Sequence, residues 1–209
     1  VTLKLYPAIV TLHLMGGMVL LALLTYQVAR QQAWLKPPVP MIHSAYLRLG
    51  LILGLILLAL QITLGGWVST NYAVLVCDTF PQCQGSYWPD MAFEQGFQIW
   101  RPLGFTAWGE LLSFQALTAI HYTHRLAAYL VVPAMLAIAW GMYRAGLPGH
   151  ARVLAGLVLL QFLTGLSNVV LGWPMVAAVM HTGGAAAMVI LLVLTTQRVR
   201  ADPYTQDST

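Results

Sequence analysis

The chain of 209 residues is much more apolar and less charged than a soluble protein. Hydrophobic residues make up 59%, charged residues make up 8%, and the mean hydropathy is +0.74, whereas soluble domains carry about 25% charged residues. This composition excludes an ordinary soluble domain and predicts an integral membrane protein. The net charge of +4 indicates membrane topology rather than nucleic-acid binding, because Lys and Arg accumulate in cytoplasmic loops.

Five stretches are apolar over the roughly 20 residues that a helix needs to cross a bilayer. Each is continuously apolar, without the alternation that the strands of a transmembrane barrel show. We therefore predict an all-α membrane protein with five transmembrane helices. The expected spans are residues 7–29, 47–69, 114–142, 152–172 and 175–197.

Basic residues indicate which connections face the cytoplasm. They cluster between the first two spans, between the third and fourth, and after the last, which makes residues 201–209 a cytoplasmic tail. Four of the six acidic residues lie instead in the segment 70–113, so we expect this long loop to be extracytoplasmic. The basic residues concerned are Arg30, Lys36, Arg48, Arg144, Arg152, Arg198 and Arg200.

The loop 70–113 holds both cysteines of the chain and many aromatic residues. Cys77 and Cys83 lie close together in sequence in an oxidising compartment, which favours a disulfide over a pair of free thiols. A loop of this length is usually functional or interfacial. Two interpretations therefore stay open, a lid over a site and a lid that only rests on the bilayer surface.

A weak internal repeat links the second and fourth spans. The segment Gln61-Ile-Thr-Leu-Gly65 is similar to Gln161-Phe-Leu-Thr-Gly165, and each precedes an inward helix that carries a histidine. Residues 46–200 therefore resemble two copies of a helix pair, which predicts a four-helix bundle of the kind that builds cofactor sites from facing helices. Residues 1–45 would add one transmembrane helix and a cytoplasmic linker.

Three histidines, His13, His124 and His181, lie at one depth in the predicted membrane. At about 1.5 Å per residue, they lie roughly 10, 13 and 9 Å inside the outer ends of their helices. Histidine within a bilayer is costly and is a functional candidate. The matched pair His124 and His181 predicts axial ligation of a flat metal cofactor, a haem, although each histidine could instead hydrogen-bond between helices.

Two residues next to His124 extend this candidate site. Arg125 has no acidic residue near it within the apolar part of any helix, so its guanidinium suits a carboxylate such as a haem propionate. Alternatively, the long side chain reaches the outer headgroups. His121 lies one turn away on the same face and could serve as a hydrogen-bond donor, a proton relay or a base, or lie at the interface without a role.

Several motifs in this order resemble the haem A synthase family, membrane enzymes that make haem A for cytochrome c oxidase. The family has eight helices in two similar halves, each with a pair of histidines. The resemblance covers nearly the whole chain and assigns residues 46–200 to the C-terminal half, and the first helix with His13 to the end of the N-terminal half. The motifs are Gly65-Gly-Trp-Val-Ser-Thr-Asn71, Cys77 to Cys83, His124-Arg125, Gly165-Leu-Ser-Asn168 and His181-Thr-Gly-Gly184.

The resemblance implies two haem sites and an oxidoreductase activity. His124 and His181 would be the axial ligands of a haem b that transfers electrons, and His13 would belong to a second site whose other histidine is absent from this sequence. The implied reaction oxidises a methyl group of haem O to the formyl group of haem A by successive hydroxylations. The Glu-x-x-His-Arg segment with the family's catalytic glutamate is also absent, and His121 stands at the matching place, which argues against activity of the chain alone.

The implied location is the bacterial inner (cytoplasmic) membrane, with several membrane crossings. The substrate would be haem O, and haem O synthase and cytochrome c oxidase assembly factors are possible partners, as is a second copy of the chain. A Cys77–Cys83 disulfide would stiffen the loop over the haem edge or take part in redox chemistry.

Two other functions stay open at this point. A b-type cytochrome that takes electrons from quinol would place its haems on opposite sides of the bilayer, against which the common depth of the histidines argues. A membrane assembly subunit without a cofactor would use the histidines only for packing between helices.

Overall fold

The computed structural model describes residues 6–35 and 42–200, and five of its helices are long and apolar enough to cross a membrane. The predicted all-α class and the number of spans are therefore confirmed. Most of the expected linker before residue 42 and the expected tail at residues 201–209 lie outside the described residues. The five helices are α1 (Pro7–Leu35), α2 (Ala45–Thr70), α4 (Phe114–Arg144), α5 (Pro148–Val170) and α6 (Met175–Thr196).

Two of the long helices, α2 and α4, begin at a serine that caps their first turn. The hydroxyl of Ser44 accepts the backbone N–H of Leu47, and the hydroxyl of Ser113 accepts that of Ala116, both at 3.2 Å, as a serine at a helix N-terminus does. Helix α5 begins at Pro148. Proline is favoured at the first position of a helix because the N–H that it lacks would have no partner within the helix there. This explains why α5 starts four residues before the predicted boundary at residue 152.

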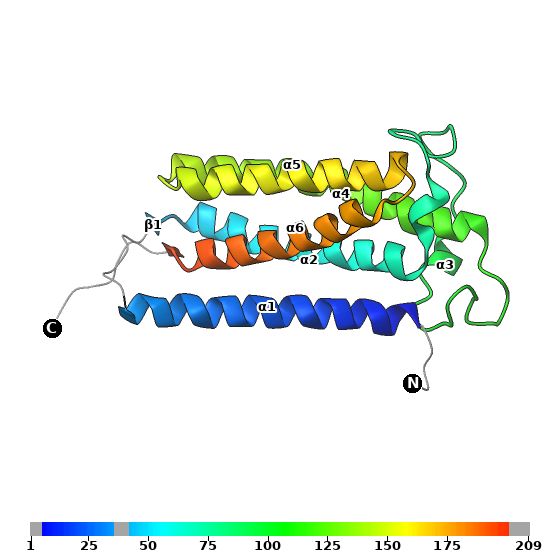
Figure 1. Ribbon diagram of the computed structural model, residues 1–209, viewed down its shortest axis with the longest axis horizontal. Coiled ribbons are helices and arrows are strands. Elements are labelled where there is room, and N and C mark those ends of the chain that lie inside the picture. Colours follow the sequence, from blue (N-terminus) through cyan, green and yellow to red (C-terminus); the bar gives the residue numbers. More distant parts are fainter. Residues whose placement is uncertain (1–5, 36–41, 201–209) are drawn as a thin grey trace.

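Helices α2, α4, α5 and α6 form a four-helix bundle in which each helix packs against the next and α6 returns to α2. Helices α4 and α6 make no close backbone contact with each other within the described residues, so they lie diagonally across the bundle. Helix α1 packs outside it, against α2 and α6 (Figure 1). The start of α1, the long loop 71–113 and the α5–α6 turn all lie at one end, which we call the loop end.

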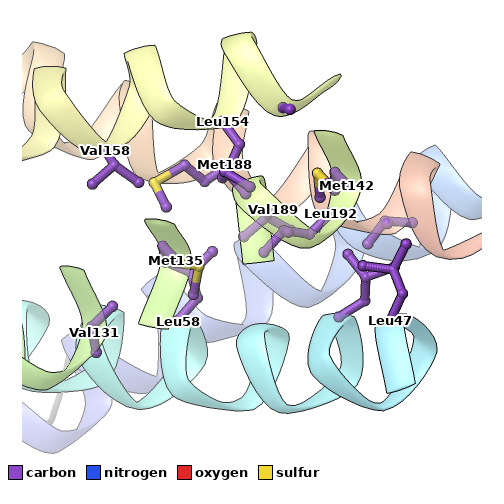
Figure 2. Packing of buried hydrophobic residues seen from close by; sticks show 14 of the residues in the cluster. Leu47, Leu58, Val131, Met135, Met142, Leu154, Val158, Met188, Val189 and Leu192 are labelled. Carbon is purple, nitrogen blue, oxygen red and sulfur yellow. The ribbon is translucent and has the colours of Figure 1, made fainter. Parts of the chain in front are cut away.

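Apolar side chains fill the bundle in the half away from the loop end. Figure 2 shows leucine, valine and methionine side chains of all four helices meeting there. Leu51, Met135, Leu154 and Leu192 are fully buried in this cluster. Because lipid chains are as apolar as leucine, close packing rather than exclusion of water holds such helices together.

The long loop is ordered and folds over the loop end of α2 and α4. It contains a short 3-10 helix η1 (Ala73–Val76) and one turn of helix α3 (Phe93–Gly96). Its Cys77 and Cys83 form a buried disulfide, which confirms the predicted pairing. The indole of Trp67 on α2 donates to the carbonyl of Gly96 at 2.9 Å and ties the loop to the bundle.

A short parallel strand pair at the opposite end is a feature that the sequence did not predict. Strand β1 (Ile42–His43) pairs with β2 (Val199–Arg200). The guanidinium of Arg48 also donates to the carbonyl of Val199 at 3.4 Å. These bonds join the start of α2 to the end of α6, and with two residues in each strand they leave the all-α class unchanged.

Candidate functional site

The polar side chains inside the bundle gather toward the loop end, beyond the apolar core. Helices α4 and α6 each contribute one histidine there, His124 and His181, and the helix beside each one contributes a glutamine and a glycine. The structure thus separates the bundle into an apolar half and a half that carries groups able to bind a polar or metal-containing ligand.

His124 packs against Gln61 and Gly65 of α2, which together form what we call its seat. The side-chain amide of Gln61 donates to the backbone carbonyl of His124 at 3.1 Å, and the same nitrogen lies 3.2 Å from Nδ1 of the ring. A Cβ atom on Gly65 would lie only 3.0 Å from Cε1 of the imidazole, so the missing side chain leaves the space that the ring occupies. The other amide atom, Gln61 Oε1, is buried without a hydrogen-bond partner in the described part of the chain.

His181 lies in a corresponding seat made by α5. The amide of Gln161 donates to the backbone carbonyl of His181 at 2.9 Å, and a Cβ atom on Gly165 would lie 3.2 Å from Cε1 of the ring. This seat also contains a hydroxyl group that the first one lacks: Thr164 Oγ1 lies 3.0 Å from Nδ1 of His181. A Cβ atom on Gly184 would overlap the Gln161 amide, so glycine at this position lets the amide cross to α6.

The two seats explain the internal repeat in physical terms. In both copies the glutamine bonds to the backbone of the helix that carries the histidine, and the glycine four residues later makes room for the ring. The two histidines belong to helices that lie diagonally across the bundle. Two imidazoles from opposite helices are a donor set that could hold a haem between them.

Two buried side-chain oxygens in this half of the bundle have no hydrogen-bond partner within the described residues. Asn168 lies one turn from Thr164 on α5, and its Oδ1 is buried with no partner in the described residues, as Gln61 Oε1 is. Buried polar atoms are nearly always hydrogen-bonded in native proteins, so two unpaired oxygens near the histidines are consistent with a polar ligand or water at this place. Among the described residues, no group of three or more His, Cys, Asp or Glu side chains is positioned to hold a metal ion.

His13 lies apart from the other two histidines. Helix α1 turns Thr11 and Leu14 toward α2, where both would contact a Cβ atom on Gly66, and the hydroxyls of Thr11 and Thr70 lie 3.3 Å apart. His13 is exposed on the face of α1 that points away from the bundle. The structure therefore does not bring His13 into the site of His124 and His181.

Arg125 is buried and points to the disulfide loop. Its Nη1 donates to the carbonyls of Thr79 and Gln82, each at 2.9 Å, and its Nη2 to the carbonyl of Cys77 at 3.4 Å. These carbonyls differ from the partners predicted from the sequence, which were a haem propionate or the lipid headgroups. A direct role of Arg125 toward a propionate stays a prediction.

His121 connects Arg125 to the start of the loop. Its Nδ1 lies 2.8 Å from the carbonyl of Ala73, and its Nε2 lies 3.4 Å from Nη2 of Arg125. Since a carbonyl only accepts, Nδ1 carries the proton and Nε2 accepts from the guanidinium. Both ring nitrogens are thus engaged in holding the loop, and the expected relay role of His121 stays a prediction.

A second buried arginine supports the same loop. Arg101 is fully buried, donates to Asn71 Oδ1 at 2.6 Å and to the carbonyl of Phe105 at 3.3 Å, and lies over the ring of Trp67. Burial lowers the pKa of Arg101, because the charged form loses contact with water. These bonds fix the loop to the end of α2, a role of Arg101 that was not predicted from the sequence.

The residues that hold the histidines were not predicted from the sequence. Gln61 and Gln161 are recognisable there only as members of the repeat, and Thr164 and Gly184 only as members of motifs. A signal was present, because a glutamine inside an apolar helix is costly unless it has a partner. Only the packing of α2 on α4 and of α5 on α6 reveals that this partner is a histidine backbone.

Comparison with known proteins gives a consistent family. Residues 1–193 match the cytochrome oxidase assembly protein family. The chain is 34% identical to a haem A synthase of Shewanella oneidensis over 92% of the chain and 58% of that protein. It is 32% identical to a haem A synthase of Methylobacterium radiotolerans over 90% of the chain and 48% of that protein.

A haem A synthase of Allorhizobium ampelinum is 32% identical over 78% of the chain and 41% of that protein. The chain thus spans about half the length of the curated relatives it matches. No solved structure matches it. With a family match over nearly all of its length, the chain belongs to the cytochrome oxidase assembly protein family.

Proposed function

We propose that this chain is part of a haem A synthase, which oxidises the methyl group of haem O to the formyl group of haem A during the biogenesis of cytochrome c oxidase. The chain would supply the C-terminal bundle and the last helix of the N-terminal half. The observation that carries the proposal is the pair of matched seats for His124 and His181, found in a chain of this family. Relatives that are named haem A synthase and are 34% and 32% identical support it.

In this proposal His124 and His181 hold a haem b inside the bundle. Gly65 and Gly165 leave room for the imidazole rings, and the apolar core of the opposite half closes the bundle on that side. When bound, a haem with two imidazole ligands has no open coordination position and supplies electron transfer rather than substrate oxidation. The residues of this chain would orient the group and exclude water from it.

Substrate oxidation would take place at a second site, to which His13 contributes. Support comes from the exposed position of His13 on the outer face of α1, and from relatives of which the match covers only 58% and 48%. The other histidine and the catalytic glutamate would lie in a segment that this sequence does not contain. Haem O would be the substrate of that complete protein.

We further propose that the protein crosses the inner membrane of a bacterium with its disulfide loop on the extracytoplasmic side. The basic residues at the opposite end and the disulfide itself support this orientation. The described loop carries Asp78, Asp90, Glu94 and Glu110, which suits the side that basic residues avoid.

Haem retention tests the C-terminal site directly. The purified chain, expressed with ample haem, is expected to show the Soret band of a low-spin haem, and the double variant His124→Ala/His181→Ala is expected to lose it. His150→Ala, at the start of α5 and away from both proposed haem sites, is the matched control and should leave this band unchanged. A double variant that retains haem with the same spectrum would overturn the assignment.

Activity needs a separate experiment on the complete protein. The chain with its upstream segment, supplied with haem O in membranes, is expected to yield haem A, measured by extraction and mass analysis. A complete protein that binds haem b but leaves haem O unchanged, alongside an active relative run in parallel, would reject the synthase proposal while leaving the haem site intact.

A further inference from the structure

We propose that the two histidines of the bundle are unequal ligands: His181 is preset to bind iron through Nε2 by a hydrogen bond to Thr164, whereas His124 must first change its hydrogen bonding to Gln61. Thr164 and Gln61 are positioning residues in this inference. It rests on the proposed haem site and goes beyond it by giving each ligand a different part in capture of the haem.

The hydrogen bonds of Thr164 determine the tautomer of His181. The Thr164 hydroxyl has one proton. Its oxygen, Oγ1, lies 2.7 Å from the carbonyl oxygen of Leu160, so the hydroxyl donates this proton to that carbonyl. Its oxygen is then the acceptor for the His181 ring at 3.0 Å, so Nδ1 of His181 carries the proton. This leaves the lone pair of Nε2 free, which is the form of imidazole that binds a metal.

At His124 the corresponding group is a donor. Position 64, one hundred residues before Thr164 in the repeat, is Leu64 and offers no hydroxyl. The nitrogen of the Gln61 amide lies 3.2 Å from Nδ1 and 3.5 Å from Nε2 of His124, and an amide N–H can only donate. If the nearer Nδ1 accepts, the ring proton is on Nε2, the nitrogen that would have to bind iron; if Nε2 accepts, its lone pair is already engaged. In both arrangements Nε2 is free for a metal only after the bond to Gln61 changes.

The unpaired oxygen of Gln61 shows how His124 can become a ligand. Gln61 Oε1 is buried and has no partner among the described residues. When the proton of His124 moves to Nδ1, an acceptor is needed beside that nitrogen, and a turn of the Gln61 amide supplies Oε1. The turned amide then loses its hydrogen bond to the backbone carbonyl of His124. Ligation by His124 therefore requires a local rearrangement, whereas ligation by His181 requires none.

A second effect follows from the same asymmetry. A metal-bound imidazole that donates its other N–H is more basic and better oriented, and loss of such a partner typically costs about 10- to 100-fold in metal affinity. His181 has this partner already in place. The haem should therefore bind first to His181 and only afterwards to His124.

Single-ligand variants of the purified chain test the order of capture. His124→Ala is expected to retain haem on His181 with a spectrum of altered spin state, whereas His181→Ala is expected to bind haem at least tenfold more weakly. Equal retention by the two variants, or stronger retention by His181→Ala, would overturn the inference. Retention by the double variant would instead reject the underlying haem site, so the two failures are distinguishable.

The role of Thr164 is tested in the otherwise unaltered chain. Thr164→Val is expected to lower the affinity for ferric haem about tenfold relative to the affinity for ferrous haem. This change corresponds to a rise of about 59 mV in the reduction potential of a one-electron couple. Thr164→Ser should restore the original potential, because it keeps the hydroxyl.

The chain provides a matched control on α2. Thr63→Val removes a hydroxyl that donates to the Ala59 carbonyl of its own helix at 2.8 Å and should leave the potential unchanged. An unchanged potential in Thr164→Val, with a normal yield of folded protein, would refute the role of Thr164, as would equal shifts in both variants.

Discussion

Replacing Gly65 by alanine would place a methyl group against the imidazole ring of His124. The new Cβ atom would lie 3.0 Å from Cε1 of the ring, closer than ordinary van der Waals contact, so the ring or α2 must shift by a few tenths of an ångström. Such overpacking costs about 1–3 kcal/mol. Alanine gains up to about 1 kcal/mol over glycine inside a helix, so the net change in folding free energy should be a loss of about 0–2 kcal/mol.

The effect on haem binding should be larger than this net change suggests, because the displaced group is the ligand itself. We expect Gly65→Ala to weaken haem binding about tenfold, which corresponds to about 1.4 kcal/mol. Titration of the haem-free protein in detergent, followed at the Soret band, measures the affinity, and thermal unfolding followed by circular dichroism measures the stability.

Gly156 on α5 provides the control for this experiment. A Cβ atom there would meet nothing within 4 Å, so Gly156→Ala should leave haem affinity unchanged and stabilise the helix by up to about 1 kcal/mol. If Gly65→Ala bound haem as tightly as the unaltered chain, the seat made by α2 would not constrain His124, and the argument from the glycine would be refuted.

Three further variants probe the loop and the second seat. Arg125→Leu should release the disulfide loop from α4 and cost about 1–3 kcal/mol through its unsatisfied carbonyls; limited proteolysis should then cut the loop faster, and an unchanged cleavage rate would contradict the role of Arg125. Replacing Cys77 and Cys83 together by alanine should destabilise the protein by about 2–4 kcal/mol yet leave turnover of the complete enzyme unchanged at equal protein levels; lost turnover in a folded variant would instead show a redox role. Gln161→Leu should disturb the low-spin spectrum by freeing the backbone of His181, and a spectrum identical to that of the unaltered chain would show that this bond does not position the ligand.

Much of the architecture could be predicted from the sequence because a bilayer leaves few options. Backbone polar groups must be satisfied within each span, so five long apolar stretches predict five helices. The helix ends lie within about four residues of the expected ones, except that α1 continues to Leu35 beyond the predicted end at residue 29. The disulfide was predictable for a local reason, since Cys77 and Cys83 are close in sequence. The repeat was also visible, because Gln61 and Gln161 begin similar pentapeptides.

What the sequence could not show is where each polar side chain points within the membrane. His13, His124 and His181 share a depth, yet rotation of α1 turns His13 outward while the bundle turns the other two inward. Depth depends only on distance along a helix, whereas rotation depends on which neighbours the helix packs against.

The partners of the buried polar groups were decided in the same way. Arg125 suited an anion on grounds of charge, but the fold of the loop brings backbone carbonyls to it. Gln61 and Gln161 had no evident partner until α2 lay against α4 and α5 against α6. The sequence by itself determined the membrane spans, their order and the disulfide, because these depend on composition and short spacings. The tertiary structure alone decided which histidines pack within the bundle and what holds them, because those contacts join residues far apart in the chain.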